Sequence, residues 1–72
     1  MRRSRDENAD TVRTARYHVL RLVATGHTNG EIGARLGLSN NTVKSYLCTV
    51  MQKLQARNRA QAVANARRYG LL

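Results

Sequence analysis

Hydrophobic residues recur along most of the chain at the three- and four-residue spacings of amphipathic helices, with short turn signals between them. The first helix is expected over residues 11 to about 25, ending at Gly26, because glycine readily adopts the left-handed backbone that closes a helix. Residues 1–10 are polar and show no apolar period, so we expect a flexible N-terminal arm. The apolar positions of the first helix are Val12, Ala15, Val19, Leu20, Leu22 and Val23.

A short second helix is predicted over about residues 28–36. Thr28 and Glu31 have the spacing of a capping box, in which each side chain bonds the other residue's backbone amide. Gly30 and Gly33 each lower helix propensity by ~1 kcal/mol relative to alanine. This helix must therefore be held by packing, or must approach another backbone closely.

A longer helix is expected over about residues 40–54, with Ser39 as its cap. Tyr46 lies at the edge between its two faces. The inward stripe is Val43, Leu47, Val50 and Leu54, and the outward face holds Asn41, Lys44, Ser45, Cys48 and Gln52, none of them acidic.

The last helix is predicted over about residues 59–69, capped by Asn58 and ending at Gly70. Its main stripe is Ala62, Val63 and Ala66, and a second stripe of Ala60, Ala64 and Arg67 has small side chains that would let two backbones come close. With no proline and no sheet-like pattern, the chain is predicted to be all-α, with four helices.

Composition restricts the function. Seventy-two residues suffice for one domain, and a net charge of +9 points to a polyanionic partner. Charges within residues 1–10 cancel, so the compact part carries ten basic residues against one acid, Glu31.

Several function classes are disfavoured by what the chain lacks. Cys48 is the single cysteine, so no intramolecular disulfide can form and a reducing, cytoplasmic compartment is expected. The two histidines have no zinc-ligand spacing, and no apolar run is long enough to span a bilayer. Paired carboxylates, an activated nucleophile and a phosphate-binding glycine loop are missing too, so we expect no enzyme, metal, cofactor or small-molecule ligand.

Two helices joined by Leu36-Gly37-Leu38-Ser39, the second longer and polar on its outer face, are typical of a helix-turn-helix. A generic helix hairpin is the alternative, but a merely solvated helix would carry both charges. The sequence resembles the LuxR/GerE-type helix-turn-helix domain over about residues 12–72. The resemblance rests on Val19 to Gly26, Asn29, Glu31-Ile32, Leu36 to Ser39, Thr42-Val43-Lys44, Lys53-Leu54, Asn58-Arg59, Ala62-Val63 and Gly70-Leu71-Leu72.

The resemblance implies a bacterial transcription regulator that binds double-stranded DNA as a homodimer through its fourth helix. By position, Lys44 corresponds to the family's base- and backbone-contacting lysine. The predicted groove contacts are Asn41, Lys44, Ser45 and Cys48; the predicted phosphate contacts are Thr28, Thr42, Tyr46, Arg57 and Arg59; the predicted dimer contacts are Ala60, Ala64 and Arg67. Capping for Asn41, a core-edge position for Tyr46 and plain solvation for the two arginines are open alternatives.

The chain departs from the family pattern at several positions. Where the family commonly begins its first helix with Thr-Pro-x-Glu, this chain has Arg13-Thr14-Ala15-Arg16, which removes an intradomain ion pair. Tyr46 replaces a usual histidine and Gly33 a usual alanine, and Ala56 stands at what we take for a glycine-like turn position. We expect the fold to survive these changes.

Two rival functions are weighed. A small modulator could use this fold to bind another regulator or RNA polymerase, with only weak DNA contact. A basic membrane-active peptide fits less well, because the capping box and two tight turns are unexpected and no single apolar face dominates.

Overall fold

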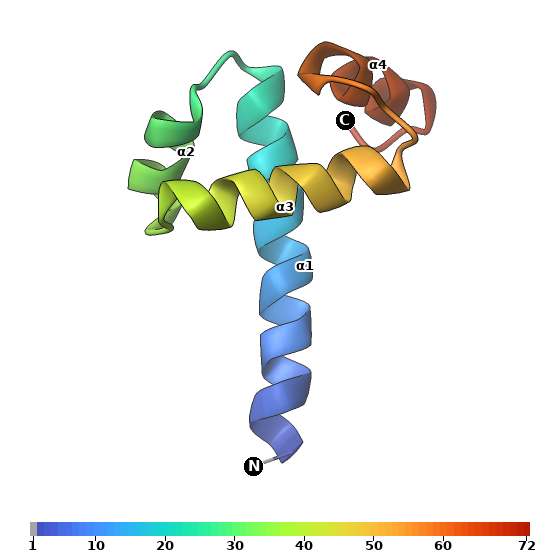
Figure 1. Ribbon diagram of the computed structural model, residues 1–72. Helices are drawn as coiled ribbons and strands as arrows, with labels where there is room; N and C mark the ends of the chain where they lie inside the picture. Colours follow the sequence, from blue (N-terminus) through green and yellow to red (C-terminus); the bar gives the residue numbers. More distant parts are fainter. Residues whose placement is uncertain (1) are drawn as a thin grey trace.

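The computed structural model describes the backbone of residues 2–72 and the side chains of residues 12–72, and over this range the chain forms four helices and no strand. They are α1 (Arg2–Ala24), α2 (Asn29–Leu36), α3 (Asn40–Lys53) and α4 (Arg59–Arg68). Helix α3 crosses in front of α1, with α2 beside one end of α3 and α4 beside the other (Figure 1). The all-α, four-helix fold expected from the sequence is confirmed.

Helix α1 is much longer than predicted. It begins at Arg2 rather than near residue 11, so the predicted start of this helix is wrong. Residues 2–10 contain no glycine or proline to stop a helix, and once a packed helix exists each further residue adds a hydrogen bond without a new nucleation cost. The expected flexibility of the arm and the side chains of residues 1–11 lie outside what the structure describes.

Helix α2 begins with the capping box that the sequence predicts. The Thr28 hydroxyl accepts from the Glu31 amide (3.1 Å), and the Thr28 amide donates to Glu31 Oε1 (2.8 Å). The helix ends at Gly37, whose φ of 70° is left-handed and favours glycine. These two local signals fix the length of α2 at eight residues.

Gly33 allows the close approach that its low helix propensity suggested. A Cβ at this position would lie 2.5 Å from the carbonyl oxygen of Leu38, in the turn between α2 and α3. The Leu38 amide donates to the Gly33 carbonyl (2.9 Å), so the turn folds back directly onto α2. This contact brings the turn, and with it the start of α3, close against α2.

The connection between α3 and α4 depends on a residue that the sequence reasoning misplaced. The left-handed residue is Gln55, with φ of 54°, and not Ala56. Ala56 is instead half-buried, and its amide donates to the Met51 carbonyl (2.8 Å). The glycine-like position of this turn is therefore one residue earlier than expected.

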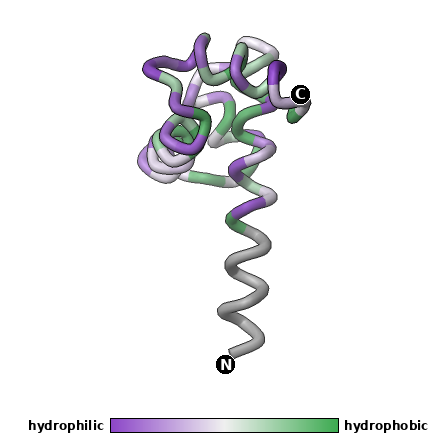
Figure 2. Tube along the Cα trace, turned by 90° about the vertical axis from the view of Figure 1, so that its right-hand side faces the viewer, coloured by the Kyte–Doolittle hydropathy of each residue, from purple (hydrophilic) through white to green (hydrophobic). Residues whose placement is uncertain are grey.

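The core consists of two adjoining clusters. One joins α1, α2 and the first half of α3 through Val19, Val23, Ile32, Val43 and Leu47. The other joins α1, the second half of α3 and α4 through Leu20, Val50, Leu54, Ala62 and Ala66. Hydrophobic and hydrophilic stretches alternate along the helices of this body (Figure 2), so each helix has one face in the core.

Candidate nucleic-acid interface

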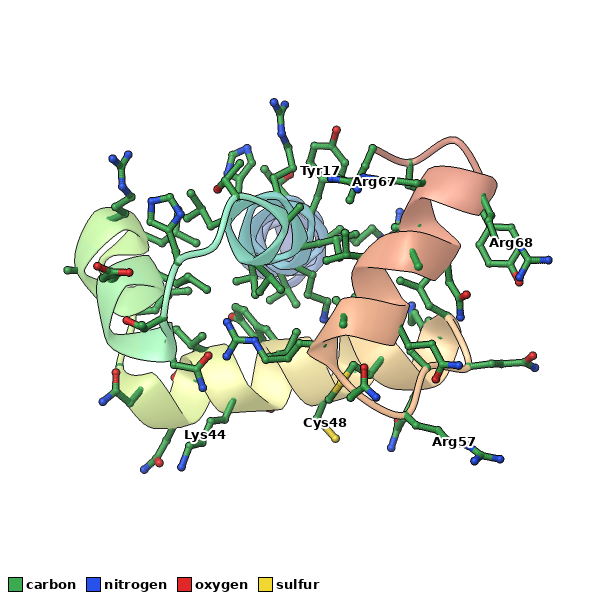
Figure 3. The ribbon with its side chains drawn as sticks, turned by 90° about the horizontal axis from the view of Figure 1, so that it is seen from above. Tyr17, Lys44, Cys48, Arg57, Arg67 and Arg68 are labelled. Atoms are coloured by element: carbon green, nitrogen blue, oxygen red, sulfur yellow. The ribbon has the colours of Figure 1, made fainter. Side chains whose placement is uncertain are left out.

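The outward face of α3 is polar and fully accessible. Asn41, Lys44, Ser45 and Cys48 are all exposed, whereas Val43, Leu47 and Val50 on the opposite side are buried. Figure 3, which views the molecule along α1, shows Lys44 and Cys48 pointing away from the body on the same side. The predicted groove-contacting residues are thus brought together on one surface without any acidic neighbour on α3.

Ser39 holds the start of this helix. Its side-chain oxygen accepts from the Thr42 amide (3.1 Å), and its hydroxyl donates to Thr42 Oγ1 (2.9 Å). Asn41 makes no such cap, because Ser39 is the N-cap residue. Asn41 is therefore exposed beside the free amides of the first turn, where an anion is stabilised by the helix dipole.

The two predicted phosphate-binding threonines both lie near the start of a helix, at different positions. Thr28 is the N-cap of α2, and Thr42 lies in the first turn of α3. Each side-chain oxygen accepts a hydrogen bond inside the domain, so each hydroxyl retains its hydrogen for a phosphate oxygen. Thr28 is exposed and Thr42 half-buried.

Tyr46 contacts another residue at which the chain departs from the family pattern. The Arg16 guanidinium carbon lies 5.9 Å from the centre of the Tyr46 ring, within the range of a cation–π contact. Tyr46 is half-buried, which agrees with the edge position that the helical spacing indicates. Arg16 of α1 and Tyr46 of α3, which both differ from the residues that the family resemblance leads us to expect, are therefore in contact.

Arg57 and Arg59 have different surroundings. Arg57 is exposed and points to the same side as Lys44 and Cys48 (Figure 3), as a phosphate contact would. Arg59 is half-buried; its guanidinium donates to Asn29 Oδ1 (2.7 Å) and to the His27 carbonyl oxygen (2.8 Å). A phosphate would have to compete with these two bonds for Arg59.

The side chains that join α4 to the rest of the domain were not foreseen. Arg59 ties the start of α4 to the turn between α1 and α2, and Asn65 Nδ2 donates to the Leu54 carbonyl (2.9 Å) at the end of α3. Asn29 and Asn58-Arg59 are among the residues on which the family resemblance rests, and nothing else in the sequence indicated that they are structurally important. Pattern alone does not reveal that Asn29 and Arg59, 30 residues apart, form a hydrogen bond.

The second stripe of α4 lies on the surface. Ala60, Ala64 and Arg67 are all exposed, while Ala62 and Ala66 on the other face are completely buried. Arg67 lies beside Tyr17 of α1, and Arg68 points outward at the far edge of α4 (Figure 3). The predicted dimer contacts are therefore accessible to a second molecule.

Electrostatics favour an anionic partner over the whole domain. Glu31 is the one acidic residue after position 10, and hydrogen bonding to the Thr28 backbone lowers its pKa, so it is ionised and held in the capping box. No group of potential metal ligands occurs among the residues described. Within the same range, no helix is both long and apolar enough to cross a bilayer.

Comparison with known proteins finds a matching family and several relatives. Residues 14–66 match the model of the GerE family, described as bacterial regulatory proteins of the luxR family. The chain is 54% identical over 54 residues to the HTH-type transcriptional activator RamA of Corynebacterium glutamicum, covering 75% of this chain and 19% of that protein. It is 44% identical over 66 residues to the uncharacterized transcriptional regulatory protein YvfU of Bacillus subtilis, covering 92% of this chain and 32% of the relative.

A third relative, the transcriptional regulatory protein DesR of Bacillus subtilis, is 35% identical over 52 residues, covering 72% of this chain and 26% of DesR. The chain thus spans less than a third of the length of these relatives. The names of the family and of these relatives indicate regulators of transcription and not enzymes.

Proposed function

Because the chain belongs to the luxR family of bacterial regulatory proteins, we propose that it controls transcription as a homodimer, with α3 in the major groove of double-stranded DNA. The observation that carries this proposal is the outward face of α3. It combines one cation, Lys44, with the small polar side chains of Asn41, Ser45 and Cys48, all exposed. Such residues can approach base edges without steric or electrostatic conflict.

The size of α3 suits the role. Fourteen residues make a helix about 21 Å long, and the major groove is about 12 Å wide and admits one α-helix. Thr28 at the start of α2, Thr42 in the first turn of α3 and Arg57 after the end of α3 would meet phosphates on either side of the groove. In this arrangement the phosphate contacts fix the register, and the face of α3 reads the sequence.

The exposed small-residue stripe supports a homodimer through α4. Ala60 and Ala64 would allow two α4 helices to come close, with Arg67 at the edge of the contact. A dimer of this kind would present two α3 helices to half-sites about 10 bp apart on a dyad-symmetric site. Ala64→Glu should then abolish the 2:1 complex on a palindromic duplex in sedimentation velocity, while Arg68→Glu, of larger charge change but outside the stripe, should leave it formed.

The decisive experiment is selection of binding sites from randomised duplex DNA at about 150 mM salt, with excess nonspecific competitor. Wild type should recover a dyad-symmetric motif. Lys44→Ala should bind that motif ~5–100-fold more weakly, corresponding to one lost base contact, while the matched control Arg68→Ala should change affinity less than about threefold.

Binding without any motif, equal in wild type and Lys44→Ala, would contradict sequence-specific regulation and leave only the attraction of the +9 charge for DNA. A modulator of another regulator or of RNA polymerase predicts a different pattern. In that case Lys44→Ala would keep its regulatory effect in cells, and substitutions on α4 would abolish it.

A further inference from the structure

An apolar depression lies where α1 crosses the second half of α3. Its floor is formed by Leu20, Val50 and Leu54, each less than a tenth exposed and all members of one core cluster. Tyr17 and Leu71 form its sides and are 41% and 46% exposed. The apolar side chains of Tyr17 and Leu71 are therefore partly exposed above a floor that belongs to the buried core.

The rim of this depression is basic. Arg13 and Arg16 of α1 and Lys53 of α3 line it, and among the side chains of residues 12–72 no carboxylate does. The Nε of Arg16 is buried and has no hydrogen-bond partner within the part of the chain that the structure describes. A guanidinium donor removed from water and left unsatisfied is costly. An anionic group at the rim would be attracted by the charged groups of Arg13, Arg16 and Lys53.

We propose that this depression is a docking site for an acidic segment of a partner protein, which inserts one aliphatic or aromatic side chain between α1 and α3. The cavity volume is about 190 Å³, below the 300–1,000 Å³ of sites for drug-sized ligands, and suits a single side chain. Carboxylates on either side of the inserted residue would meet Arg13, Arg16 and Lys53. The proposal concerns a contact to protein and does not rest on the DNA-binding role of α3.

Two other occupants fit the site less well. A DNA phosphate would satisfy the three cations, but it would leave the exposed apolar surface of Tyr17 and Leu71 uncovered. The compact part of a second copy carries ten basic residues against one acid, so it would be repelled by the same rim. An acidic segment with an apolar anchor is the occupant that matches both the floor and the rim.

The test uses a defined probe, the acetylated and amidated peptide Asp-Glu-Phe-Asp-Glu, titrated into the ¹⁵N-labelled chain and followed by heteronuclear NMR. Amide shifts should concentrate at Leu20, Val50, Leu54 and Leu71. The peptide with serine in place of phenylalanine has the same charge, and it should bind at least about tenfold more weakly, because only the apolar anchor is lost.

Charge reversal on the rim separates docking from general attraction. The double variant Arg13→Glu/Lys53→Glu should weaken binding of the phenylalanine peptide about tenfold or more. The matched double variant Arg57→Glu/Arg68→Glu changes the net charge equally at exposed positions outside the depression, and should change affinity less than about threefold. Lys44→Ala should bind the peptide as wild type does, whatever its effect on DNA.

Equal weakening in the two double variants, or shifts spread over the outward face of α3, would overturn the proposal, since the peptide would then be held by net charge alone. A loss of DNA affinity larger in Arg13→Glu/Lys53→Glu than in Arg57→Glu/Arg68→Glu, with no binding of the peptide, would also overturn it. That result would assign the rim to the DNA backbone.

Discussion

Replacing Arg59 tests whether the start of α4 is held by one side chain. Arginine at the first position of a helix places a cation against the positive end of the helix dipole, which is unfavourable by itself. Here the guanidinium extends to the turn between α1 and α2, with donor–acceptor distances of 2.7 Å to Asn29 and 2.8 Å to His27. Arg59→Ala removes both hydrogen bonds and the connection between α4 and that turn.

The magnitude follows from the two bonds. A hydrogen bond to a charged group contributes about 1.5–3 kcal/mol, but both acceptors are only partly buried and water can replace the donor. Relief of the unfavourable dipole returns about 0.3–1 kcal/mol. Arg59→Ala should therefore lower the free energy of unfolding by roughly 1.5–3 kcal/mol, and with a shift of about 4–8 °C per kcal/mol the Tm should fall by roughly 6–24 °C.

The assay is urea and thermal unfolding followed by circular dichroism at 222 nm. Arg57→Ala is the matched control: it removes an exposed arginine two positions earlier and should change stability by less than about 0.5 kcal/mol. Arg59→Lys should resemble Arg59→Ala, because an ammonium cannot reproduce the fork that spans two acceptors. If Arg59→Ala matched Arg57→Ala in stability and lost only DNA affinity, Arg59 would be a phosphate contact and the reasoning would be wrong.

Three further predictions concern single positions. Gln55→Gly should raise the free energy of unfolding by ~0.5–1 kcal/mol in urea titrations. A residue other than glycine in the left-handed conformation costs ~1–2 kcal/mol, and the substitution removes this cost. Glycine also has more conformational freedom in the unfolded chain, which offsets part of the gain. Gly33→Val should lower the free energy of unfolding by ~1–3 kcal/mol. Gly30→Val, where the new Cβ would meet only Thr28 Oγ1 at an ordinary contact distance of 3.9 Å, should cost less than half as much. The pKa of Glu31 is below its ordinary value of 4.5, so the contribution of Glu31 to stability is complete above pH 4.5 and is lost as the pH falls through the lowered pKa. When the pH is lowered from 4.5, the urea midpoint of the wild type should therefore decrease more than that of Glu31→Gln. Parallel pH curves for the two proteins would contradict this.

The features that the sequence predicted correctly are those governed by local chemistry. The capping box at Thr28, the cap at Ser39 and the cap at Asn58 each need only residues within one turn, and all three are formed. The buried stripe of α3 likewise follows from spacing alone. These signals place the outward face of α3, and with it the candidate interface, because the opposite face of a helix is fixed once its core face is known.

The features that were missed depend on contacts between distant residues or on context. The bonds of Arg59 to His27 and Asn29 join positions about 30 apart, and no periodicity encodes them. We expected the left-handed turn residue at Ala56, but it is Gln55. Neither glutamine nor alanine is a residue type that favours a positive φ, so the sequence does not indicate which of the two adopts it. The N-terminal extension of α1 has no apolar face, so hydrophobic spacing could not reveal it.

The contact between Arg16 and Tyr46 joins two positions at which the sequence differs from the pattern that the family resemblance implies, and we expect the two side chains to be coupled. A glutamate at position 16 would lack the cation–π contact, and an arginine there would gain little from a histidine at 46. The guanidinium carbon, 5.9 Å from the ring centre and partly removed from water, should couple to the ring by about 0.5–1 kcal/mol. A double-mutant cycle with Arg16→Met and Tyr46→Leu, measured by urea unfolding, isolates this coupling.

The cycle has a matched reference. Arg21 lies at the same 5.9 Å from the ring of Tyr17, but that ring is 41% exposed, so the pair Arg21→Met and Tyr17→Leu should give a smaller coupling, below about 0.5 kcal/mol. Coupling that is equal in the two cycles would mean that burial adds nothing to the Arg16–Tyr46 contact. The two departures would then be independent substitutions, and the Arg16 side chain would be free to serve the basic rim of the α1–α3 depression alone.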